Sequence, residues 1–170
     1  MKKIFLLLAL LLTGCTGIPA NIEPVTPFDV EKYLGTWYEI ARLDHSFERG
    51  LTRVTATYSR RDDGGVRVLN RGYSPQDKAW KEAEGKAYFV RAPDQGYLKV
   101  SFFGPFYGSY IVVELDQAHY QYALVCGPDR SYLWILARTP HLQEDIRAAL
   151  VAKAAALGFD TDKLLSIDHD

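Results

Sequence analysis

The sequence predicts an all-β domain of eight antiparallel strands followed by one α-helix. Short alternating or β-rich runs recur after residue 28, turn-forming residues separate them, and the apolar period becomes helical near the C-terminal end. The eight runs span residues 36–42, 53–59, 66–72, 81–90, 97–102, 109–115, 121–126 and 132–138. Consecutive strands with short connections form a sandwich or a closed barrel, and composition alone does not choose between them.

Turn and capping residues set the limits of these elements. Residues 62–65 (Asp-Asp-Gly-Gly) suit a tight hairpin, because Asp and Gly tolerate positive φ. After the eighth run, Thr139 is expected to cap a helix with Pro140 at its first position, and Gly158 is a natural stop. A short helical turn is also expected at residues 29–34. The apolar stripe of the long helix comprises Leu142, Ile146, Leu150, Ala154 and Leu157.

The overall composition excludes several classes of protein. A length of 170 residues fits one ordinary domain with a single buried core. The 20 Lys+Arg residues against 21 Asp+Glu residues argue against a nucleic-acid-binding protein, which normally carries a basic surplus. A hydrophobic fraction of 48% is too high for a disordered chain, and two cysteines are too few for a disulfide-stabilised miniprotein.

The first 15 residues have the pattern of a lipoprotein signal sequence. Lys2 and Lys3 precede nine apolar residues, 4–12, which suit a signal peptide and are too few to span a membrane. The following Thr13-Gly14-Cys15 completes a pattern that resembles the bacterial lipobox. That resemblance implies that the Cys15 thiol takes a diacylglyceryl group and that cleavage makes Cys15 the first mature residue. The alternative is an ordinary secretory signal with a chance cysteine.

Cleavage before Cys15 would change the net charge of the chain. Loss of residues 1–14 removes two of the 20 basic residues and leaves all 21 acidic ones, a net charge of −3. Membrane attachment would then depend on acyl chains. In similar lipoproteins an aspartate after the cysteine favours the inner membrane, so Thr16 indicates the outer membrane of a Gram-negative bacterium. Residues 15–27 are expected to form the lipidated cysteine and a tether, and residues 28–170 the folded domain. Without Cys15, the thiol of Cys126 has no intrachain partner, and its apolar neighbours predict that it is buried.

A set of residues near the two ends of the strand series carries a specific resemblance. Gly35-Thr36-Trp37 opens the first strand and Arg138 ends the eighth, with the runs 120–125 and 132–136 before it. Together they resemble the lipocalin family, from about residue 28 to residue 159, and within it the bacterial outer-membrane lipocalins related to apolipoprotein D and the plant temperature-induced lipocalins. The resemblance implies an eight-stranded antiparallel up-and-down barrel with the C-terminal helix packed on its outside.

In lipocalins the residues of this motif are structural. The resemblance implies that Trp37 plugs the closed end of the barrel and that Arg138 packs across its ring, where a guanidinium gains cation–π energy. Gly35 would permit a close approach, since it has no Cβ.

The resemblance also implies a fatty acid or lysophospholipid as the ligand, held in the barrel without a cofactor. An eight-stranded barrel is wide enough for one small ligand. Aromatic residues within predicted strands are the pocket candidates, although each could instead fill a dry core or lie under the helix. They are Tyr58, Phe89, Phe102, Tyr110, Tyr122 and Trp134.

An apolar turn at residues 102–108 (Phe-Phe-Gly-Pro-Phe-Tyr-Gly) is unusual for a loop in water. It could contact the membrane, line the entrance to the barrel or form a dimer contact, or it could fold onto the barrel rim. Homodimers occur among the bacterial proteins that the chain resembles, so a homodimer is an open alternative.

Catalysis is not expected from this sequence. Its four histidines are widely separated, and it has no metal-ligand spacing, nucleophile elbow or phosphate-binding loop. Glu82 and Glu84 share a strand face that is expected to be solvated. The acidic C-terminal residues, among them Asp168 and Asp170, are expected to form an exposed tail. Two alternatives to a lipid carrier are an envelope lipoprotein without a dedicated ligand, structural or stress-related, and a haem carrier that uses His45 or His119.

Overall fold

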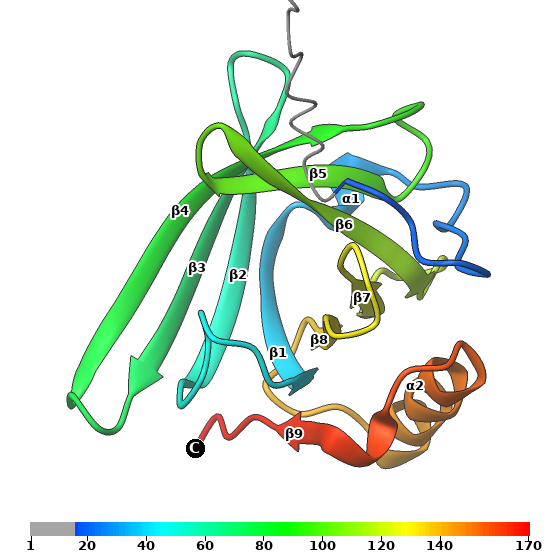
Figure 1. Ribbon diagram of the computed structural model, residues 1–170. Helices are drawn as coiled ribbons and strands as arrows, with labels where there is room; N and C mark the ends of the chain where they lie inside the picture. The colour runs from blue at the N-terminus through cyan, green and yellow to red at the C-terminus, as the bar shows by residue number, and fades with distance from the viewer. Residues whose placement is uncertain (1–15) are drawn as a thin grey trace, which may run out of the picture.

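Eight strands form a closed antiparallel barrel in the computed structural model, which describes residues 16–170 (Figure 1). Each strand pairs with the next, and β1 pairs with both β2 and β8, which closes the barrel. The strands are β1 (Gly35–Leu43), β2 (Thr52–Arg60), β3 (Val66–Ser74), β4 (Ala79–Phe89), β5 (Tyr97–Phe103), β6 (Phe106–Leu115), β7 (Tyr122–Cys126) and β8 (Leu133–Ala137). The predicted all-β barrel is therefore confirmed.

A ninth strand, β9 (Leu164–Ser166), follows the 3₁₀ turn η1 (Thr161–Lys163) and pairs with the end of β1. On this side β2 pairs with β1 only over the first four residues of β1, up to Tyr38. Between Ala41 and Leu43, the peptide groups of β1 that point to this side would be left without partners, and β9 supplies them. The acidic side chains of this segment are exposed, as expected, but its backbone is held to the barrel, since the N–H of Arg53 also donates to the carbonyl oxygen of Asp168 (2.7 Å).

The two α-helices differ in how closely their start points match the sequence prediction. Helix α1 (Val30–Tyr33) begins after Asp29, whose side chain accepts a hydrogen bond from the N–H of Glu31 (3.0 Å). Helix α2 (Glu144–Ala156) begins after Gln143, later than the expected start at Pro140. The Thr139 hydroxyl donates to the carbonyl oxygen of His141 (2.7 Å) and does not cap the helix.

The hydrophobic core has two parts, separated by the barrel wall. The inner cluster fills the barrel from the closed end and includes Trp37, Tyr58 and Val125. The outer cluster lies between the barrel wall and α2, where Leu150 and Ala154 of the helix are buried against residues such as Ile135. Alternate residues of each strand point into the barrel or away from it, which assigns them to one cluster or the other.

Residues 16–27, which the sequence predicts to be a tether, lie against the barrel. Ile22 is buried in the outer cluster. The N–H of Val25 donates to the carbonyl oxygen of Val112, and its own carbonyl oxygen accepts from the N–H of Gly96, each at 2.9 Å. Within residues 16–170, no helix has the length and apolar character needed to cross a membrane.

Candidate functional site

Trp37 and Arg138 close one end of the barrel. The Trp37 ring is fully buried, and its Nε1 donates to the carbonyl oxygen of Tyr33 (2.8 Å). The guanidinium of Arg138 lies 4.0 Å from the centroid of that ring. It also donates to the carbonyl oxygens of Lys32 (2.7 Å), Thr36 (3.1 Å) and Tyr120 (3.2 Å), and so joins three segments of the chain.

Gly35 has a conformation that suits this closed end. Its φ of +95° is one that residues with a side chain rarely adopt, and a Cβ atom there would lie 3.3 Å from Nη1 of Arg138.

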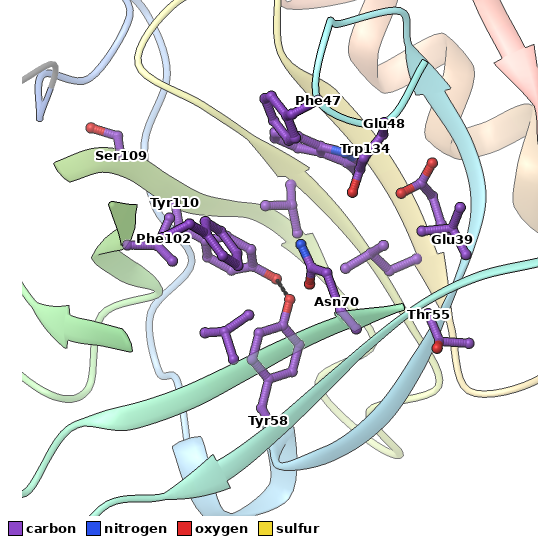
Figure 2. A pocket seen from close by; sticks show the side chains of 16 residues that line it. Glu39, Phe47, Glu48, Thr55, Tyr58, Asn70, Phe102, Ser109, Tyr110 and Trp134 are labelled. Atoms are coloured by element: carbon purple, nitrogen blue, oxygen red, sulfur yellow. Dashed lines mark hydrogen bonds between the residues drawn. The ribbon is translucent and has the colours of Figure 1, made fainter. Parts of the chain in front are cut away.

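The barrel interior contains a cavity that opens at the other end. An inner part of about 90 Å³ and an outer part of about 370 Å³ share Phe47, Glu48, Val54, Asn70 and Phe102 as lining residues, so the two are continuous. Figure 2 shows the inner part, with side chains from several strands and the β1–β2 loop pointing toward one space. Its other lining residues are Glu39, Thr55, Ala56, Tyr58, Val68, Val100, Ser109, Tyr110, Val125, Trp134 and Leu136.

The six aromatic pocket candidates fall into three positions. Four of them line the inner cavity: Tyr58, Phe102, Tyr110 and Trp134. Phe89 packs inside the barrel near its closed end, with its ring centroid 6.2 Å from that of Phe28, and lines neither part of the cavity. Tyr122 packs against the outer cluster, on the opposite face of β7 from the interior residue Val125.

Three tyrosine hydroxyls form a hydrogen-bonded chain at the inner end of the cavity. The hydroxyl of Tyr110 lies 2.7 Å from that of Tyr33 and 2.8 Å from that of Tyr58 (Figure 2 shows the second pair). Burial raises the pKa of all three phenols, so all three are uncharged at neutral pH. The inner end of the cavity therefore holds polar atoms that already have partners.

Two buried carboxylates, which the sequence analysis did not single out, also line the inner cavity. Glu39 accepts from Nη1 of Arg42 (2.6 Å), and Glu48 accepts from Nε1 of Trp134 (3.1 Å). Burial, together with the nearby Glu48 carboxylate, raises the pKa of Glu39 well above its usual range. Although burial also acts on Glu48, the adjacent His45 ring and the Trp134 N–H hold the pKa of Glu48 below its usual value.

These two glutamates make the inner part of the cavity acidic, because no described basic residue lines it. Figure 2 shows the side chains of Glu39 and Glu48 turned toward each other beside Trp134. Among the described residues that line the inner part there is no Lys or Arg. Arg71 and Lys81, each with a half-exposed side chain, line the outer part together with Glu82. Strand alternation could have placed Glu39 inside, two residues from Trp37, whereas Glu48 lies in a loop and carries no such signal.

Of the other ionisable residues singled out by sequence, Glu82 lines the outer part of the cavity, and His45, His119 and Glu84 line neither part. His45 is buried, with its ring centroid 3.9 Å from that of Phe47, and His119 is exposed in the β6–β7 turn. Glu82 and Glu84 are exposed and pair with Arg residues of β3. Within residues 16–170, no group of three or more His, Cys, Asp or Glu side chains could hold a metal ion.

The Cys126 thiol is buried in the outer cluster, and burial raises its pKa to about 12.

Comparisons with known proteins agree with this geometry. The family model described as "Lipocalin-like domain" matches residues 28–169. The chain is 56% identical to the "Outer membrane lipoprotein Blc" of Vibrio cholerae, covering 99% of each chain, and 55% identical to that of Escherichia coli, covering 95% of this chain and 92% of the relative. The crystal structure of insecticyanin from the tobacco hornworm Manduca sexta matches with a TM-score of 0.71 at 24% identity, over 91% of this chain and 87% of that one. This chain belongs to the lipocalin family.

Proposed function

We propose that this lipocalin is an outer-membrane lipoprotein that binds, stores or transports a fatty acid or lysophospholipid in its barrel. The observation that carries the proposal is the cavity, which is lined by aromatic and aliphatic side chains and is closed at one end by Trp37 and Arg138. Burial of ~400 Å² of acyl surface contributes roughly 10 kcal/mol before ordering costs, enough for micromolar binding without charge pairing.

The lining supports one orientation of such a ligand. The acyl chain points inward, toward Val68 and Val125, and the polar head stays near the mouth. An anionic head would be repelled by the Glu48 carboxylate beside the inner part, whereas Arg71 and Lys81, next to Glu82, offer positive charge at the outer part. The polar end therefore remains accessible, and different head groups are tolerated.

The anchor and location form the second part of the proposal. Cys15 would carry the acyl chains after removal of residues 1–14, both of which lie outside the described residues. The lipobox-like sequence and Thr16 support this, and so do the names of the Vibrio cholerae and Escherichia coli relatives. The barrel then lies in the periplasm, held to the outer membrane by lipid.

Ligand binding can be tested directly on the mature chain with Cys15→Ser, produced without its leader. Lipids that co-purify are extracted for mass spectrometry. Tryptophan emission is then titrated with lysophospholipid, fatty acid, retinoid and haem, in a Trp80→Phe background that leaves Trp37 and Trp134 as the two emitters. Saturable binding of the two lipids supports the carrier, saturation by haem alone would favour the haem alternative, and no response to any of the four would leave an envelope protein without a ligand.

A matched pair of variants separates cavity binding from surface binding. Asn70 lines both parts of the cavity, and the adjacent Leu69 faces the outside of the barrel. Asn70→Phe should block the passage and abolish saturable binding. Leu69→Phe should bind like the unmodified chain. Equal binding by both variants would place the ligand outside the cavity.

A further inference from the structure

Four ionisable side chains are buried together in the barrel wall beside the cavity. They are Glu39 and Arg42 of β1 and His45 and Glu48 of the β1–β2 loop, and none of the four is more than 6% exposed. Nη1 of Arg42 donates to Oε1 of Glu39 (2.6 Å), and its Nη2 donates to the backbone carbonyl oxygen of Glu48 (2.7 Å). Nε2 of His45 lies 3.1 Å from Oε2 of Glu48. One guanidinium and two carboxyl groups therefore occupy a space from which water is excluded.

The two carboxyl groups are in a position to influence each other's ionisation. Figure 2 shows the side chains of Glu39 and Glu48 turned toward each other, and both line the inner part of the cavity. Arg42 keeps its positive charge, because an arginine does not lose its proton in a protein. That charge can compensate one carboxylate, whereas a second buried carboxylate would lack a partner of opposite charge. Two carboxyl groups that share a site therefore ionise at different pH values.

The contacts of the two carboxyl groups indicate which of them keeps a proton. Although burial opposes it, the His45 ring and the Trp134 N–H hold the pKa of Glu48 below its usual value. Burial, and then the nearby Glu48 carboxylate, raise the pKa of Glu39 well above its usual range, although Arg42 acts in the opposite direction. A protonated Glu39 can also donate a hydrogen bond to the Glu48 carboxylate. The proton is therefore held on Glu39.

The other ionisable residues of the cavity do not change charge in the same pH range. Tyr58 and Tyr110 line the inner part from β2 and β6, and burial raises the pKa of both phenols, so they remain uncharged. The outer part is lined by Arg71, Lys81 and Glu82, which are half-exposed and remain charged. Among the described residues that line the inner part, Glu39 is thus the one that ionises as the pH rises above the usual range of a carboxyl group.

We propose that Glu39 and Glu48 share a single proton, and that loss of this proton as the pH rises weakens the binding of anionic ligands in the cavity. The proposal rests on the ligand binding given under the proposed function and adds its regulation. With the proton in place, Glu48 is the one carboxylate at the inner part. Once Glu39 ionises, a second negative charge faces the ligand. By linkage, an anionic ligand that enters at high pH favours the return of one proton from water to Glu39.

The test compares two probes whose own charge is constant between about pH 5 and pH 9. Dodecyl sulfate, used below its micellar concentration, stays anionic, and monododecanoylglycerol is uncharged. The mature chain with Cys15→Ser should bind dodecyl sulfate about fivefold more weakly at the upper end of this range, the effect of one added charge at the cavity. Its affinity for monododecanoylglycerol should stay constant. Constant affinity for both probes would overturn the shared proton and leave the carrier function intact, whereas binding of neither probe would refute both.

Three single substitutions assign the pH dependence to a residue. Glu39→Gln keeps the size of the side chain and should bind dodecyl sulfate at every pH with the affinity that the parent chain has at the lower end of the range. Glu84→Gln, on the exposed face of β4, is the matched control and should keep the full pH dependence. His45→Gln should keep it too. If His45→Gln loses the pH dependence and Glu39→Gln retains it, the titrating group is His45 and the proposal is wrong.

The shared proton can also be observed in the parent chain, so the result does not depend on the folding of a variant. Carbon-13 NMR of the glutamate carboxyl groups follows each one through its titration. One resonance should titrate above the usual range of a glutamate and another below it. At the upper end of the pH range, dodecyl sulfate should shift the first of these toward its protonated position. Titration of every glutamate near its usual pKa would contradict a shared proton.

Discussion

Replacing Trp37 by alanine removes the most buried ring at the closed end of the barrel. Loss of a buried tryptophan side chain costs about 3–5 kcal/mol. The Trp37→Ala variant also loses the cation–π contact with Arg138, about 0.5–2 kcal/mol, and leaves the Tyr33 carbonyl oxygen without its indole donor. Because these contributions share atoms and are not additive, we expect a total of about 4–6 kcal/mol. A domain of this size is stable by about 5–15 kcal/mol, so the variant should fold only marginally.

The barrel contains a matched control for this substitution. Trp80 on β4 also lies under a guanidinium, with Arg71 3.9 Å from its ring centroid, but its side chain is 43% exposed. Trp80→Ala should cost about 1 kcal/mol or less, because the exposed cation–π pair contributes little and no cavity forms. Urea unfolding of both variants, followed by far-ultraviolet circular dichroism, gives the two free energies. Similar losses for Trp37→Ala and Trp80→Ala would refute the role of Trp37 as the plug.

Three further predictions concern the interior and the wall. Native Cys126 should resist thiol reagents at pH 8 and react at once in denaturant, since burial raises its pKa to about 12; rapid labelling of the folded chain would contradict its burial. Tyr110→Phe should lower the free energy of unfolding, measured in urea, by about 1–3 kcal/mol, because it leaves two buried hydroxyls without their shared partner. An unchanged free energy would mean that a water molecule takes the place of the Tyr110 hydroxyl. Glu48→Gln should strengthen dodecanoate binding about fivefold, the effect of roughly 1 kcal/mol of charge repulsion. Glu84→Gln, which lines neither part of the cavity, should not change it. Calorimetric titration that finds the two variants equal would exclude the Glu48 carboxylate from the ligand site.

The barrel strands can be predicted from local sequence patterns, but contacts between segments that are distant in the chain cannot. Alternation and turn residues indicate the eight strands, since each depends on neighbours in the chain. Strand β9 depends on the divergence of β2 from β1 after Tyr38, which leaves peptide groups of β1 to be paired. That divergence is a property of the closed barrel. No residue of the C-terminal segment signals it by itself.

The sequence predicts a cavity-lining residue only on a strand for which one residue is already known to point into the barrel. Trp37 is a plug inside the barrel, so alternation along β1 places Glu39 inside too. Tyr122 has no such reference in β7, and it faces the outer cluster with Cys126. Bulges in β1 and β6 further break the simple alternation on which a longer extrapolation would depend. Glu48 reaches the cavity from a loop, where no period exists.

The closed end of the barrel contributes mainly to stability, and the open end contributes mainly to binding. At the closed end Arg138 satisfies three carbonyl oxygens and covers Trp37, so a change there leaves buried polar groups without partners and affects the whole fold. At the open end Phe103 and Phe106 expose most of their surface and bury little, so their loss removes little folding energy. Substitutions at the mouth should therefore alter ligand affinity while the unfolding free energy stays nearly constant. Substitutions in the mouth and the inner lining can then change ligand affinity without weakening the plug that keeps the barrel closed.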